Sequence, residues 1–167
     1  TSQVSSSNIV YTFDYDEYLC ISYNGNVTLN SFDEKTFSNN VLIYTSSNDN
    51  AGSIKISTKD DMIVISGQAG GTSTGWANLY HYDRTKNTIS AAIPLIATGT
   101  DRNASDNFGT YVYVNTDLNQ LIISSPNHAY DVNSLNPITG AGAIYAFSIN
   151  SDNSLTFLQK MVASTRS

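Results

Sequence analysis

The chain has 167 residues, 40% of them hydrophobic, so it can bury a core and is not a disordered polymer. Only 13% of the residues are charged and the net charge is −6, with basic residues scattered, which excludes a phosphate-binding stripe for nucleic acid or anionic membranes. No apolar run approaches the length of a membrane-spanning helix, so we expect no membrane insertion.

The same phrase occurs three times: an extended run, a short acidic turn, and an apolar strand that ends in Ser. The copies are Asn8–Tyr23, Ser53–Gly67 and Gly109–Pro126. A phrase that recurs at this spacing indicates repeated units that must stack to bury their apolar faces. Alternating apolar residues without a helical period indicate an all-β chain.

We predict three units of four strands, joined by turns rich in Gly, Asn, Asp and Ser. In the first unit, residues 8–46, the predicted strands are Ile9–Phe13, Leu19–Tyr23, Val27–Phe32 and Val41–Thr45. In the second unit, residues 52–97, they are Ser53–Ser57, Met62–Ser66, Ala77–Tyr82 and Ile89–Ala97. In the third unit, residues 106–164, they are Tyr111–Asn115, Leu121–Ser125, Ala143–Ile149 and Leu155–Ala163.

The connection between the second and third strands grows from unit to unit. It is Asn24-Gly25 in the first unit, Gly67–Trp76 in the second and Pro126–Gly142 in the third. In repeat proteins such insertions map to loops on one face, often the binding face. We therefore expect both long loops to emerge at the same end of the molecule.

The candidate ligand-binding residues lie in these two loops: Trp76, His128, Tyr130 and Asp131. Aromatic rings beside a carboxylate suit a sugar or peptide ligand, which needs a flat apolar face and oriented polar groups. The alternative is structural. Trp76 would pack under its own Gly-rich loop, and His128 and Tyr130 would fasten theirs to the sheet.

The third unit carries the most specific motif. Asp106-Asn-Phe-Gly109 precedes the strand TYVYVN, then LIISSP, and then Gly142-Ala-Ile-Tyr-Ala-Phe147. This order closely resembles the FG-GAP repeat of integrin-α-like β-propellers. Ser124-Ser125-Pro126 stands where that family has Gly-Ala-Pro, Ala51-Gly52 replaces Phe-Gly in the second unit, and the first unit is degenerate.

The resemblance implies a β-propeller of four-stranded antiparallel blades, with the whole of residues 1–167 forming one propeller segment. Three blades do not close a ring, since propellers typically need about four to eight. Either further blades of a parent chain complete it, which we favour, or copies of the chain assemble. The implied role is a secreted or cell-surface module for adhesion or assembly that binds a protein or glycan. A lectin-like propeller and a non-catalytic remnant of a propeller enzyme are the alternatives.

Calcium is a further implication, because many family members bind it in an Asp-rich turn between the first two strands. The candidate ligands here are Asp14, Asp16 and Glu17, but the turn is short and lacks the family's Gly. A solvated hairpin turn is the interpretation that we favour, and we expect no other cofactor.

Nothing in the sequence indicates catalysis: it contains no Ser nucleophile elbow, metal triad or phosphate loop, so we predict that the chain is not an enzyme. The single cysteine, Cys20, is predicted to be a buried structural thiol. Two tripeptides that begin at Asn26 and Asn103 are glycosylation acceptors and fit a secreted history.

Overall fold

The computed structural model describes residues 10–14, 18–23, 26–33, 36–45, 55–59, 61–67, 74–95, 103, 105–115 and 117–163. These residues form thirteen strands and no helix, which confirms the predicted all-β class. Within this described part of the chain, no helix is long and apolar enough to cross a membrane.

The strands form three antiparallel sheets in chain order. The first sheet consists of β1 (Val10–Asp14), β2 (Tyr18–Tyr23), β3 (Asn26–Asp33) and β4 (Thr36–Thr45). The second consists of β5 (Lys55–Lys59), β6 (Met62–Gly67), β7 (Trp76–Asp83), β8 (Thr88–Ile89) and β9 (Ile93–Leu95). The third consists of β10 (Val112–Asn115), β11 (Gln120–Ser125), β12 (Ala143–Ile149) and β13 (Leu155–Val162).

Several predicted strands differ from the structure by one or two residues at their ends, and two differ more. The strand predicted over Ile89–Ala97 is divided into β8 and β9, which both pair with β7. At the break, the Ser90 amide donates to the carbonyl of His81, but the His81 amide donates to Oγ of Ser90 at 2.9 Å. Because this side-chain oxygen replaces the Ser90 carbonyl as acceptor, the ladder ends there. β4 begins at Thr36, well before the predicted start at Val41, since its polar first half still pairs with β3.

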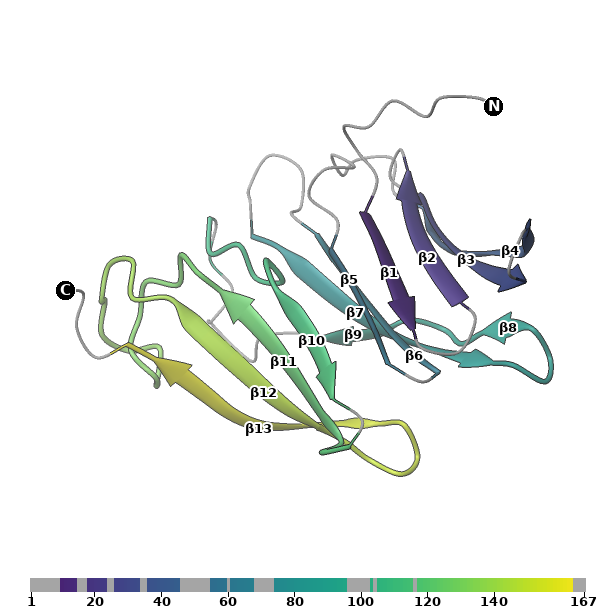
Figure 1. The fold of residues 1–167 in the computed structure, drawn as a ribbon. Helices are drawn as coiled ribbons and strands as arrows, with labels where there is room; N and C mark the ends of the chain where they lie inside the picture. The colour runs from purple at the N-terminus through teal and green to yellow at the C-terminus, as the bar shows by residue number, and fades with distance from the viewer. Residues whose placement is uncertain are drawn as a thin grey trace.

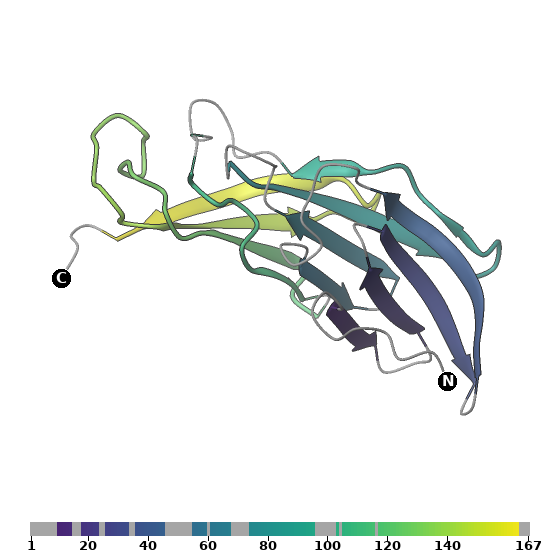
Figure 2. The same cartoon turned by 90° about the horizontal axis from the view of Figure 1, so that it is seen from above.

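The three sheets lie side by side, with the second in the middle (Figures 1 and 2). The first strand of each sheet neighbours the first strand of the next, because β5 contacts both β1 and β10. The sheets do not close into a ring. The arrangement brings equivalent ends of successive sheets together, which matters for the loops described below.

The main described core lies between the second and third sheets. Val64 and Leu79 face Leu121, Ile123 and Tyr145, and all five side chains are fully buried. Each aliphatic side chain of this kind stabilises the fold by about 1.5–3 kcal/mol. Buried positions alternate with partly or fully exposed ones along β11 and β12, which explains why one face of the third sheet supplies this core.

The second and third sheets differ in how many faces are covered. In β6 the consecutive residues Ile63, Val64 and Ile65 are all buried, so both faces of the second sheet are packed. The third sheet is covered on one face only. Its outer face presents Tyr113 at 58% exposure, with Ile144 and Met161 at 43% each.

Candidate functional site

A single turn, Asp106–Gly109, joins the bases of the two long loops. The amide of Phe108 donates to the carbonyl of Thr74 at 3.1 Å, next to the start of β7. The carboxylate of Asp106 lies 3.2 Å from Nδ1 of His128, in the loop between β11 and β12. The bases of the two long loops therefore meet at one end of the molecule, as the spacing of the repeats predicts.

His128 lies under its loop and does not reach solvent. Its side chain is 0% exposed, and that of its partner Asp106 is 4% exposed. The rings of Tyr130 and Tyr145 lie 6.2 Å and 6.4 Å from the imidazole. Within the described residues, Nε2 of His128 has no hydrogen-bond partner. In this conformation His128 fastens the loop to the third sheet.

The loop over residues 126–142 folds back on itself like a hairpin. Tyr130 and Pro137 form an antiparallel bridge, and the amide of Ile138 donates to the carbonyl of Ala129 at 2.8 Å. At the base, the amide of Gly142 donates to the carbonyl of His128 at 3.0 Å. These backbone bonds give the loop a defined shape between its two flanking strands.

Asp131 holds the tip of this loop from inside. Its carboxylate accepts from Nδ2 of Asn136 at 2.6 Å and from the amides of Leu135 and Asn133 at 2.9 Å and 3.1 Å. These hydrogen bonds lower the pKa of Asp131 below its ordinary value, and the one from the Asn136 side chain has the largest effect. Both carboxylate oxygens are therefore engaged within the loop.

A buried lysine on β13 supports the same tip. Lys160 is 5% exposed, and its Nζ donates to the carbonyl of Asp131 at 3.1 Å and to Oγ of Ser134 at 2.7 Å. The apolar stem of a lysine can be buried when the ammonium group is hydrogen-bonded in this way. The loop tip is thus tied to the edge strand of the third sheet.

Two aliphatic side chains at this tip point into solvent: Val132 is 52% exposed and Leu135 is 77% exposed. Sequence reasoning missed both, because a Val or Leu in a loop is no signal by itself. Tyr130 is partly buried. Trp76 is also partly buried, and its ring lies so close to Gly67 that a Cβ there would be 3.0 Å from it.

The remaining predicted site residues lie mostly outside the described side chains. Asp14 ends β1, whereas Asp16 and Glu17 fall outside the described residues. Among the residues that the structure describes, no group of three or more His, Cys, Asp or Glu side chains could hold a metal ion. Asn26 begins β3, and Cys20 lies within β2. The amide of Asn103 donates to Oδ2 of Asp106 at 3.1 Å.

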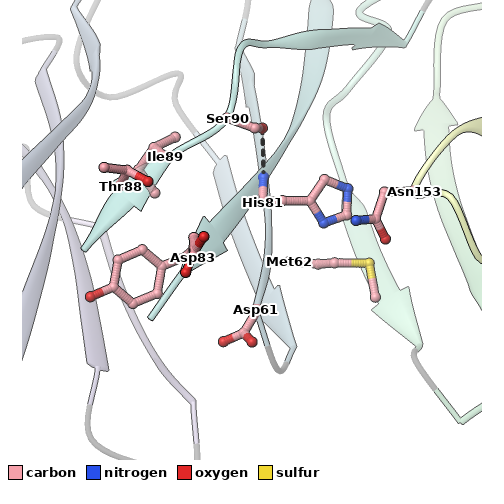
Figure 3. Close-up of a pocket in the computed structure, with 9 residues that line it drawn as sticks. Asp61, Met62, His81, Asp83, Thr88, Ile89, Ser90 and Asn153 are labelled. Carbon is pink, nitrogen blue, oxygen red and sulfur yellow. Dashed lines mark hydrogen bonds between the residues drawn. The ribbon is translucent and has the colours of Figure 1, made fainter. Parts of the chain in front are cut away.

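A separate hollow of about 540 Å³ lies at the other end of the strands, between β7 and β8 of the second sheet and the turn that joins β12 to β13 (Figure 3). The ring of His81 points toward Asn153 on one side of the hollow. The two carboxylates of the lining are already engaged, since Asp61 bonds Arg84 and Asp83 bonds Lys86. The pKa of Asp83 lies below its ordinary value, mainly because the side chain of Lys86 donates a hydrogen bond to the carboxylate.

We expect His81 to make the stability of the fold depend on pH. Burial lowers the pKa of His81 below its usual 6.5, while the backbone of Asn153 and the charge of Asp61 oppose the shift. Its Nε2 is buried without a hydrogen-bond partner among the described atoms, and the cost of burying a charged ring outweighs the effects of Asn153 and Asp61. Protonation therefore favours the unfolded chain.

The free energy of unfolding should fall as the pH drops below 6.5 and through the lower pKa of folded His81, and it should be restored above 6.5. Urea titrations at about pH 8 and about pH 5 measure this loss. In the variant His81→Gln the loss over this range should be smaller. Parallel pH profiles for the two proteins would contradict the assignment.

Comparison with known proteins adds no relative: no protein-family model matches the chain, and no curated protein matches it. The likeness to FG-GAP repeats therefore depends on the motif residues alone.

Proposed function

We propose that the chain is part of a β-propeller and serves as a binding module of a secreted or cell-surface protein, with the loop 126–142 as its contact for a protein partner. Three successive antiparallel sheets with adjacent first strands support the propeller. The Asp106–Gly109 motif at the start of the third sheet supports it as well. Neither a catalytic nor a cofactor role forms part of the proposal.

The observation that carries the binding role is an ordered loop that holds aliphatic side chains in solvent. Asp131 and Lys160 fix the tip, while Leu135 is left 77% exposed. A loop that is already ordered loses less conformational entropy when it binds. An exposed aliphatic side chain on such a loop is suited to enter a pocket on a partner.

A protein partner fits this tip better than a sugar does. A sugar site needs a free carboxylate or amide beside an aromatic face, but the Asp131 carboxylate is engaged with three donors of its own loop. An array of glycans tests the lectin alternative directly, and specific binding there would favour it over the protein partner.

The test measures binding of the purified protein to cell surfaces and to matrix proteins. It compares the unchanged protein with a double variant that carries both Val132→Ser and Leu135→Ser. We expect at least a tenfold loss of affinity, about 1.4 kcal/mol, with an unchanged circular dichroism spectrum. Leu118→Ser is the matched control, because Leu118 is 63% exposed on the turn between β10 and β11. Equal binding by all three proteins would count against the loop as the contact.

A further inference from the structure

The second sheet holds the turn Asp106–Gly109 in a socket at one end of β6 and β7. We define the inner socket as Ser66, Thr74, Gly75 and Trp76. Thr74 accepts the Phe108 amide, and Oγ of Ser66 donates to the carbonyl of Gly109 at 2.6 Å. Phe108 is only 3% exposed, and its ring packs edge-on against Tyr145 at 5.3 Å.

Gly75 makes this close approach possible. A Cβ at Gly75 would lie 1.9 Å from the carbonyl oxygen of Phe108, and the residue has a φ of +82°. Glycine is the residue that accepts both conditions, since it has no Cβ and adopts positive φ readily. The inner socket thus holds the backbone of the Phe108-Gly109 turn, and the Phe108 side chain is buried in the core cluster that contains Val64, Ala77 and Leu79 of the second sheet.

The third sheet repeats this construction in the same register. Ser66 pairs with Ala77, and Ser124 pairs with Ile144. Two residues before these partners stand Gly75 and Gly142, whose φ values are +82° and +74°. The following strands, β9 and β13, also match in register, because Leu95 pairs with Ala77 just as Met161 pairs with Ile144.

We define the outer socket as Ser124, Ala141, Gly142 and Ala143, the matching positions on the third sheet. These residues line a hollow of about 510 Å³, together with Tyr111, Ile144 and Met161. Ile144 and Met161 are each 43% exposed, whereas their counterparts Ala77 and Leu95 are 2% and 4% exposed. The third sheet covers Ala77 and Leu95, whereas Ile144 and Met161 are exposed among the described residues.

The polar part of the outer socket is also suited to a turn. Oγ of Ser124 accepts a hydrogen bond from the amide of Tyr111 at 3.0 Å. A serine hydroxyl has a hydrogen to donate as well, so it can bond an incoming carbonyl as Ser66 bonds that of Gly109. The surrounding outer face has no charge at Tyr111, Tyr113, Ile144 or Met161. An apolar sheet face of this kind is typical of an interaction surface.

We propose that the outer socket binds an aromatic-Gly turn carried by a further unit of this repeat, whose sheet packs on the outer face of the third sheet. A second copy of this chain is unsuited to the role, because its own Phe108 is 3% exposed in the inner socket. The inference rests on the propeller proposed above and deepens it, but it does not depend on the loop 126–142.

The test uses the full chain and a synthetic peptide with the sequence of residues 103–115, which contains the Asn-Phe-Gly turn. The chain has two methionines, Met62 and Met161, so methyl-labelled methionine gives one probe in the outer socket and one internal control. At peptide concentrations of about 5 mM we expect the Met161 signal to shift and the Met62 signal to stay, with a Kd on the order of 1 mM. The peptide with Phe108→Ala should bind at least tenfold more weakly.

Ile144→Lys should abolish the Met161 shift, and Leu118→Lys, an exposed change elsewhere, should leave it intact. An unshifted Met161 signal, or equal effects of the two peptides, would overturn the proposal. A Met161 shift that depends on protein concentration without peptide would assign the surface to a second copy instead. None of these outcomes involves Val132 or Leu135, so failure here is distinct from failure of the loop as the binding contact.

Discussion

Replacing Gly75 with Ala is expected to lower the free energy of unfolding by about 3 kcal/mol or more, because the added Cβ would overlap with neighbouring backbone atoms. It would lie 1.9 Å from the carbonyl oxygen and 2.6 Å from the nitrogen of Phe108, which are backbone atoms. The positive φ adds a strain of about 1–2 kcal/mol in any residue with a side chain. Relief requires the Asp106–Gly109 turn to leave the inner socket, which opens the core between the second and third sheets.

Gly142→Ala is the matched control for this experiment. Its φ of +74° gives a similar backbone strain, but the nearest atom to an added Cβ is the carbonyl oxygen of Pro126 at 3.1 Å. We therefore expect Gly142→Ala to cost only about 1–2 kcal/mol in urea unfolding. Equal losses at the two glycines would mean that the contact with Phe108 does not limit the fold.

Most of the strand order could be predicted from local sequence, because each strand carries its own signal. β12 has the predicted ends, Ala143 and Ile149, since aromatic and small residues alternate along it. The division of β8 from β9 could not be predicted. The division depends on whether the His81 amide donates to the carbonyl oxygen or to Oγ of Ser90, and the sequence does not distinguish the two acceptors.

The candidate site was less predictable, because its residues meet across long stretches of chain. His128 and Asp106 are 22 positions apart, and the fold of the third unit brings them together and buries both side chains. Residue type and loop length are enough to name Trp76, Tyr130 and Asp131 as candidates. The correspondence between Gly142 and Gly75 could not be predicted in this way, because it becomes visible only when the register of the strands is known.

Asp106→Ala should also lower the free energy of unfolding strongly, because two hydrogen-bond donors share the Asp106 carboxylate as their acceptor. Oδ2 of Asp106 lies 3.2 Å from Nδ1 of His128 and 3.1 Å from the Asn103 amide. An unsatisfied buried group costs about 1–3 kcal/mol, so we expect a total loss of about 2–6 kcal/mol for the two donors in urea unfolding. Asp117→Ala, at an exposed turn, should change the free energy of unfolding by less than about 0.5 kcal/mol.

The same variant separates the base of the loop 126–142 from its tip. The base depends on His128, whose carbonyl accepts the Gly142 amide, whereas the tip is closed by the carboxylate of Asp131. Hydrogen exchange in Asp106→Ala should therefore quicken at the Gly142 amide and stay slow at the Leu135 amide, because only the base loses its anchor. Uniform exchange along the loop would show that base and tip open as one unit, and Asp131 with Lys160 would then not be enough to hold Leu135 in place for a partner.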